Sequence, residues 1–246
     1  EMRATLELGD RLAAAALARA VQHKLIEETA VVVYFQKSPM VRLLPYVPLA
    51  LIGVDLTAIA DGARLLAIAH EAGHHVYRQL TVNYTANLDR QVVAGIGAAS
   101  APSPVPEWLA AWREEVFADV YSVLVAGPAA GWSVQAMLMS ELPAAMLYDD
   151  GDHPLPALRP EIAVAVVRAL AAKRGGAAGR KLENAADALQ QAWYAHLGTL
   201  ELDNSFAVAA TGAHVPLVDA RRQLQAFVDQ MLAGPLAVLV EADGNT

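Results

Sequence analysis

The chain contains no cysteine among its 246 residues. This absence excludes disulfide bonds, a catalytic thiolate and cysteine-ligated metal centres, so any metal ion would have to be bound by His, Asp or Glu. Basic residues are also scarce: 18 Lys and Arg stand against 26 Asp and Glu, which gives a net charge of -8. Because phosphate-backbone binding requires an excess of positive charge, we expect no nucleic-acid partner.

Charged residues make up only 18% of the chain, whereas hydrophobic residues make up 55%. This balance argues against disorder and provides for a large core. Much of the apolar content is alanine, a strong helix former. The composition therefore predicts a predominantly helical α+β fold. We expect one domain over residues 1–246, with the core of the site within 55–160 and a C-terminal helical part over 160–235.

Two stretches bear on membranes and targeting. The first ten residues lack the basic and apolar regions of a signal peptide, which favours a cytoplasmic location unless the chain is a fragment. The uncharged stretch from Val120 to Ser140 is long enough to span a bilayer, but Gly127-Pro128 and Gly131 interrupt it. We expect two buried helices there, and membrane association is not favoured.

Periodicity and breaker residues predict the remaining elements. In chain order they are a helix over Asp10–Thr29, a strand over Ala30–Phe35, a proline-interrupted edge strand or extended loop over Val41–Val54, a helix from Asp61-Gly62 to Leu80, a long surface loop over Thr81–Pro106, a helix over Glu107–Ala126, a shorter helix to Leu142, a connector over Tyr148–Pro160, and helices over Glu161–Lys173, Arg180–Leu197 and Val218–Leu232.

The pattern His70-Glu71-Ala72-Gly73-His74 (H-E-x-x-H) lies inside the helix expected up to Leu80. Residues four apart share one face of a helix, so both imidazoles can bind one metal ion. Glu71 is placed to act as general base on a zinc-activated water. The motif is short enough to arise by chance, so two helix histidines without a metal remain the alternative.

A third ligand is expected from the helix over 107–126, because a catalytic zinc takes three protein ligands. Glu115 and Asp119 lie four residues apart on one face of that helix, together with Trp112 and Ala111. Buried carboxylates are costly unless they are paired or bind a metal. We expect Glu115 to complete a Zn²⁺ site with His70 and His74, and Asp119 to hold the outer nitrogen of a histidine.

H-E-x-x-H followed by a helix with E-x-x-A-D resembles the gluzincin metallopeptidases. The residues that carry this resemblance are His70, Glu71, His74, Glu115, Ala118 and Asp119. It covers less than half of the chain. It implies a zincin-like domain with a small sheet packed against the H-E-x-x-H helix, a zinc cofactor, Glu115 as third ligand and Asp119 bound to the first histidine. The metzincin pattern is absent, because Tyr77 and Leu80 stand where it requires Gly and His.

The segment Asp152-His153-Pro154, with Arg159, is similar to the His-Pro…Arg segment of M48-type membrane and periplasmic peptidases. This resemblance implies that His153 lies near the zinc, where it would stabilise an oxyanion or ligate the metal in a resting state. His-Pro is a common dipeptide in loops, so a plain loop histidine remains the alternative.

Other conspicuous side chains have simpler interpretations. Glu114 is expected to be a surface or capping charge, and His75 to face solvent or a backbone carbonyl. Tyr77, Tyr148 and Tyr194 can donate to an oxyanion but are more often core residues. The tryptophans Trp108, Trp112 and Trp132 are expected in the core, and His23, His196 and His214 are expected to be structural.

The sequence therefore predicts a zinc metallopeptidase acting on a peptide or protein substrate, with the substrate extended beside an edge strand over Leu49–Asp55. Three alternatives stay open. One is a catalytically inactive zinc-binding regulatory or interaction domain. The others are a hydrolase of non-peptide amides and a structural helical protein without metal.

Overall fold

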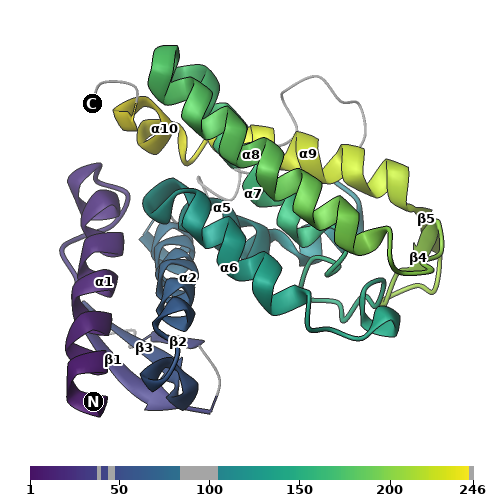
Figure 1. The fold of residues 1–246 in the computed structure, drawn as a ribbon. Helices are drawn as coiled ribbons and strands as arrows, with labels where there is room; N and C mark the ends of the chain where they lie inside the picture. Colours follow the sequence, from purple (N-terminus) through teal and green to yellow (C-terminus); the bar gives the residue numbers. More distant parts are fainter. Residues whose placement is uncertain (38–39, 44–47, 84–104, 244–246) are drawn as a thin grey trace.

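The computed structural model describes residues 1–37, 40–43, 48–83 and 105–243. Within this part of the chain the protein is mostly helical with a small sheet, as the composition predicts. Figure 1 shows the first helix, the sheet and helix α2 on the left of the molecule and most of the later helices on the right. The loop expected over 81–106 lies largely outside the described residues.

The three-stranded sheet consists of β1 (Ala30–Gln36), β2 (Met40–Leu43) and β3 (Leu49–Asp55) in the order β1-β3-β2. β1 pairs with β3 in parallel and β2 pairs with β3 in antiparallel register. The prediction that Leu49–Asp55 forms an edge strand is therefore wrong, because β3 is the central strand. Pro48 precedes that strand, and its carbonyl accepts a hydrogen bond from Ala30 N at 2.8 Å.

Helix α1 (Met2–Gln22) packs against β1 and α2. It begins and ends earlier than the predicted helix over 10–29. Asp10 does not cap it; its carboxylate instead accepts a hydrogen bond from Val33 N at 2.7 Å, which ties α1 to the sheet. The helix ends before Lys24, whose φ of 58° is the left-handed conformation that terminates helices.

The segment that follows β3 leads into the motif helix. A short helix η1 (Leu56–Ile59) precedes η2 (Gly62–Leu66), and η2 continues into α2 (Ala67–Asn83). Asp61 caps η2, since its side chain accepts a hydrogen bond from Ala63 N at 3.1 Å. The predicted helix start at Asp61-Gly62 is thus confirmed.

The second half of the site comes from a helix pair. The helix predicted over 107–126 is divided into α4 (Glu107–Ala111) and α5 (Arg113–Ala126), with a break at Trp112. α6 (Pro128–Leu138) follows, so the uncharged stretch from 120 to 140 forms two helices joined at Gly127, as predicted. No helix among the described residues is long and apolar enough to cross a bilayer.

The C-terminal part places further helices against α5. After η3 (Pro143–Ala145) and a connector come α7 (Arg159–Arg174), α8 (Gly176–Leu197), β4 (Ser205–Ala207), β5 (His214–Pro216), α9 (Leu217–Ala233) and α10 (Ala237–Asp243). The three predicted helices of this part are confirmed with small shifts of their bounds. The β4–β5 hairpin and α10 were not predicted, since both are shorter than the windows in which periodicity shows.

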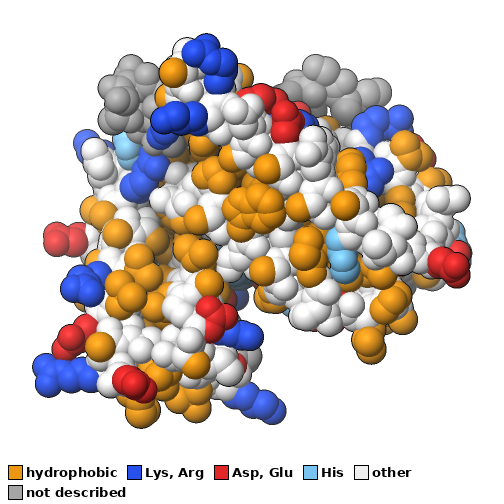
Figure 2. Space-filling view, viewed as in Figure 1, with side chains coloured by type: hydrophobic (Ala, Val, Ile, Leu, Met, Phe, Trp, Pro, Cys, Tyr) orange, Lys and Arg blue, Asp and Glu red, His pale blue; other side chains and the backbone are white. Residues whose placement is uncertain are grey.

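The main hydrophobic core of the described residues extends from Ala13 of α1 to Leu239 of α10, and a second, smaller cluster is formed by Leu138, Met146, Ala157 and Trp193. Trp108 and Trp112 belong to the main core, as predicted. Trp132 does not: it is 41% exposed, so its core prediction is wrong. Figure 2 shows apolar atoms spread over the middle of the face that α6 and α8 form, with charged side chains mostly toward its margins.

Candidate metal centre

Helices α2 and α5 cross at two small residues, Gly73 and Ala118. A Cβ atom built on Gly73 would lie 2.7 Å from the Cα atom of Ala118, a distance that packed carbon atoms do not reach. Glycine at this position therefore lets the two backbones approach closely. Both residues lie within the motifs themselves, so the crossing brings the histidines of α2 opposite the carboxylates of α5.

Three donor groups converge at this crossing. The Nε2 atoms of His70 and His74 lie 3.0 Å apart. Oε2 of Glu115 lies 3.3 Å from Nε2 of His70, and Oε1 lies 3.2 Å from Nε2 of His74. The ligand atoms of these three residues all lie within 4.8 Å of one another, so the group can hold a metal ion.

The donor set fits a tetrahedral cation. Ligand atoms at zinc–nitrogen distances of about 2.0–2.1 Å lie roughly 3.3 Å apart from each other in a tetrahedral site. The three separations of 3.0, 3.2 and 3.3 Å among His70, His74 and Glu115 are close to that value. Facing Nε2 lone pairs of two neutral imidazoles repel each other, so either a proton or a metal cation lies between these atoms.

The outer nitrogen of His70 faces a carboxylate, as the sequence predicts. Its Nδ1 atom lies 2.8 Å from Oδ1 of Asp119, which is only 4% exposed. An ionised carboxylate only accepts hydrogen bonds, so the nearness of Asp119 favours a proton on Nδ1, although this contact lacks the alignment of a hydrogen bond. Nε2 faces the donor group, where Nη2 of Arg159 also lies 3.5 Å from it.

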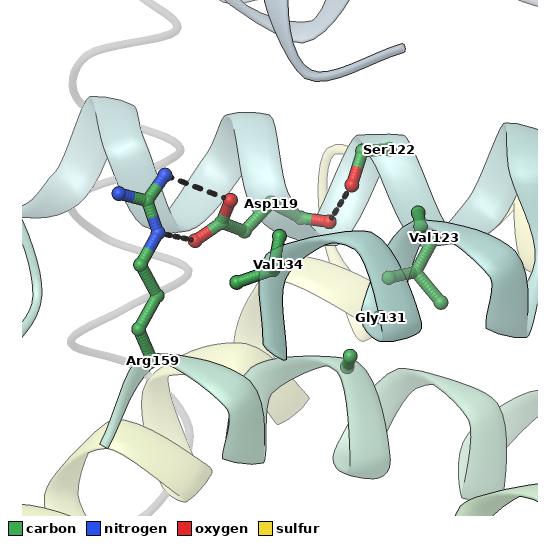
Figure 3. A pocket seen from close by; sticks show the side chains of 8 residues that line it. Asp119, Ser122, Val123, Gly131, Val134 and Arg159 are labelled. Carbon is green, nitrogen blue, oxygen red and sulfur yellow. Dashed lines mark hydrogen bonds and ion pairs between the residues drawn. The ribbon is translucent and has the colours of Figure 1, made fainter. Parts of the chain in front are cut away.

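Arg159 is a component of the site to which the sequence assigned no role. Its Nε and Nη2 atoms lie 2.7 and 3.0 Å from the two carboxylate oxygens of Asp119, and Nη2 also lies 3.1 Å from Oε2 of Glu115. Figure 3 shows the guanidinium group reaching Asp119 from the start of α7. The resemblance that drew attention to His153 contained this arginine, but only the fold shows that it reaches α5.

The Asp119–Arg159 pair lies against an apolar surface. A small cavity beside it is lined by residues of α5, α6 and α7, among them Ser122, Gly131 and Val134. Gly131 allows α6 to approach α7 closely, because a Cβ there would lie 2.8 Å from Cβ of Ala163. This packing excludes bulk solvent, so the ion pair is weakly screened.

Glu114 is not the surface or capping charge that the sequence predicted. Its Oε1 atom accepts hydrogen bonds from Nδ1 of His74 at 2.9 Å and from Nε of Arg78 at 2.6 Å. A helical wheel placed Glu114 off the ligand face, because adjacent residues diverge by about 100°. The imidazole of His74 lies between Glu114 and Glu115, so both reach it.

His75 also differs from its prediction. The residue is completely buried rather than solvent-facing, and neither ring nitrogen has a hydrogen-bond partner among the described residues. Burial lowers the pKa of His75 to about 4, because the charged ring would lose its hydration. The neutral ring therefore acts as a packing residue of the motif helix.

The electrostatics of the cluster favour bound positive charge. Burial disfavours the imidazolium of His74, but hydrogen bonds to Glu114 and Glu115 outweigh it and raise its pKa to about 9. Burial likewise opposes ionisation of Glu115, yet the two histidines and Arg159 hold its pKa far below the usual range. Carboxylates of this kind bind protons poorly and cations well.

Glu71 is the remaining acid of the motif. It is 7% exposed, and burial is the main cause that raises its pKa above the ordinary value, while the neighbouring imidazoles oppose that shift. A carboxylate with a raised pKa is a better proton acceptor than a solvated one.

His153 lies at the margin of the cluster. Its Nε2 atom is 3.7 Å from Oε1 of Glu115, and its Nδ1 atom is 2.8 Å from Oδ2 of Asp150. The ring is half exposed, and Asp150 also accepts the backbone N–H of His153. The structure therefore brings His153 beside the metal-binding group, as the sequence predicts; its role there stays a prediction.

Three other histidines are not part of this group. The metal-binding group found among the described residues contains none of His23, His196 and His214. Tyr77 packs against Phe117 at 5.2 Å between ring centroids. The rings of Tyr148 and Tyr194 are 68% and 41% exposed, so neither is a core residue.

No protein-family model matches the chain, and no curated protein or solved structure matches it either. The resemblance to gluzincin peptidases therefore rests on the two motifs alone. What the chain offers beyond that resemblance is the group His70, His74 and Glu115, which can hold a metal ion.

Proposed function

We propose that this chain is a zinc-dependent metallopeptidase of zincin-like fold. The observation that carries the proposal is the convergence of two imidazole nitrogens and one carboxylate, spaced as in a tetrahedral site, beside the buried carboxylate of Glu71. Two histidines and a glutamate are a usual ligand set of catalytic zinc. A bound zinc would supply a Lewis acid that polarises a peptide carbonyl and makes water more acidic.

Glu71 serves as the general base in this proposal. Its buried carboxylate accepts a proton from the attacking water and passes that proton to the nitrogen of the leaving amine. The raised pKa of Glu71 suits both halves of this transfer, because the group must bind the proton and then release it.

His153 is the candidate for contact with the reacting carbonyl. The Nδ1 atom of His153 faces Asp150, and the Nε2 atom of the same ring faces Glu115. A protonated ring donates from this nitrogen to the developing oxyanion, whereas a neutral ring offers a lone pair to the metal. Both roles are part of the resemblance stated above.

An extended substrate needs a free strand edge, and β3 does not provide one. β2 is the edge strand next to α2, and the structure describes no strand paired with its outer side. We propose that a peptide substrate adds to this edge, where backbone groups of β2 can bind it along the motif helix.

Replacing Glu71 with Gln tests the proposal. The variant should bind one zinc per chain, like the wild type, and should lose cleavage of casein or of a peptide library by a factor of at least about 100. Zinc content is measured by elemental analysis, and wild-type protein treated with a chelator is the control for background proteases.

Unchanged cleavage by the zinc-loaded Glu71→Gln variant would show that the general base is wrongly assigned. A wild-type protein that binds zinc but cleaves no peptide would favour the alternative of an inactive zinc-binding domain. A chain without stoichiometric metal would contradict both.

A further inference from the structure

Each imidazole of the site has a carboxylate close to its outer nitrogen. Nδ1 of His70 lies 2.8 Å from Asp119, which is 4% exposed. His74 is held by Glu114, whose side chain is 31% exposed. Both carboxylates come from α5, and each of them is bound in turn by an arginine. The pair His70–Asp119 follows from the spacing between Glu115 and Asp119 that the sequence analysis used, whereas the pair His74–Glu114 does not.

We propose that Glu114 is a positioning residue of the metal site, which fixes the tautomer and orientation of His74 and thereby sets the affinity for the metal. The inference rests on the proposed metal site but does not require peptidase activity. Glu114 is not a ligand in this proposal; it acts through His74.

The geometry at His74 supports this role from both sides of the ring. Nδ1 lies 2.9 Å from Oε1 of Glu114, and Nε2 lies 3.2 Å from Oε1 of Glu115. Two consecutive residues of one helix therefore contact the two nitrogens of one imidazole. With Glu114 present, the proton is held at Nδ1 and the lone pair at Nε2. Without it, the ring is free to rotate and to carry its proton at Nε2, where a metal cannot bind.

Arg78 holds the carboxylate of Glu114 in place. It lies one helical turn after His74 on α2, so its guanidinium reaches the same oxygen that the imidazole reaches, at 2.6 Å. Arg78 therefore fixes the carboxylate of Glu114 at the position where it accepts from Nδ1 of His74.

The test compares zinc affinities of folded variants. Glu114→Ala removes the acceptor, and Glu114→Gln keeps an oxygen of the same reach without the charge. Glu107→Ala, at an exposed glutamate of the neighbouring α4, is the matched control. Zinc dissociation constants are measured by competition with a chromogenic chelator, and the visible spectrum of the Co²⁺-substituted protein reports on the ligand geometry.

We expect Glu114→Ala to bind zinc about 10–100-fold more weakly and to change the Co²⁺ spectrum, with Glu114→Gln recovering part of the affinity. Glu107→Ala should match the wild type. Urea denaturation of the metal-free proteins separates a folding defect from a positioning defect; if the Ala variant fails to fold, Glu114→Gln decides by the same measurement.

The result that overturns the inference is a folded Glu114 variant whose zinc dissociation constant lies within twofold of the wild type and whose Co²⁺ spectrum is unchanged. A wild-type protein that binds zinc but cleaves no peptide leaves the inference standing and refutes only the proposed function. Absence of zinc from the wild type overturns both.

Discussion

Gly73 is the position at which the fold and the candidate site depend most directly on one another. In the interior of a helix, Ala is favoured over Gly by about 1 kcal/mol, so a Gly73→Ala substitution would ordinarily stabilise the protein. Here we expect the opposite. The new Cβ would lie 2.7 Å from Cα and 3.0 Å from the carbonyl oxygen of Ala118, and both of these are backbone atoms.

The size of the effect follows from these distances. Packed carbon atoms approach to about 3.5–4.0 Å, so α5 has to move away from α2 by roughly 1 Å. Overpacking of this kind costs about 1–3 kcal/mol, whereas the gain in helix propensity is about 1 kcal/mol. At the upper end of the overpacking range, the protein therefore loses about 2 kcal/mol of stability. Metal sites tolerate displacements of only about 0.2 Å, so zinc affinity should fall at least tenfold.

Two measurements on one pair of variants check this reasoning. Urea denaturation of the metal-free protein gives the change in the free energy of unfolding, and chelator competition gives the zinc dissociation constant. Gly62→Ala is the matched control, because a Cβ on Gly62 meets no atom within 4 Å; its stability should change by less than about 1 kcal/mol.

A Gly73→Ala protein that is as stable as the wild type and binds zinc with unchanged affinity would refute the argument. Such a result would mean that α2 and α5 do not cross as closely as described.

Two further substitutions test how the site is supported. Arg159→Met removes the arginine that pairs with the buried carboxylate of Asp119 and should lower the free energy of unfolding of the metal-free protein by about 3–5 kcal/mol, measured in urea, with Arg159→Lys recovering only part because lysine lacks the bidentate geometry. An undiminished unfolding midpoint for Arg159→Met would contradict the pairing. Asp149→Ala removes the acceptor of Trp112 Nε1 at 3.0 Å and of Ala209 N at 2.8 Å, which should cost about 1–3 kcal/mol and speed hydrogen exchange at the amide of Ala209. Unaltered exchange at that amide would show that Asp149 does not anchor the segment before β5.

The parts of the site that the sequence predicted are those that depend on spacing within one helix. His70 and His74 share a face of α2 because they are four residues apart, and the same rule places Glu115 and Asp119 on one face of α5. These local rules need no knowledge of how the chain folds. The burial of both carboxylates was likewise inferred from Trp112, which lies on that face and is itself buried.

What the sequence did not predict depends on contacts between distant segments. Arg159 reaches Asp119 across 40 positions, and no pattern in the chain announces the pair. The central place of β3 depends on which strands pair, and two prolines near its start favoured an edge instead. The contact of Glu114 is not predicted by a helical wheel, because the wheel gives only the direction in which a side chain leaves its own helix. It does not show that the ring of His74 on α2 lies within hydrogen-bond distance of Glu114.

The charge of the site is compatible with the divalent cation of the proposed function. Four acids lie in or beside the donor group: Glu71 on α2 and the three carboxylates of α5 described above. Arg78 pairs with Glu114, and Arg159 contacts both Asp119 and Glu115; these two positive charges leave two negative charges when the imidazoles are neutral. A divalent cation balances this charge at the point where the lone pairs converge. In its absence the cluster draws protons instead, which is why the pKa of His74 rises to about 9. Purified protein that held only monovalent ions at this site would contradict the expectation that a divalent cation balances the two remaining negative charges.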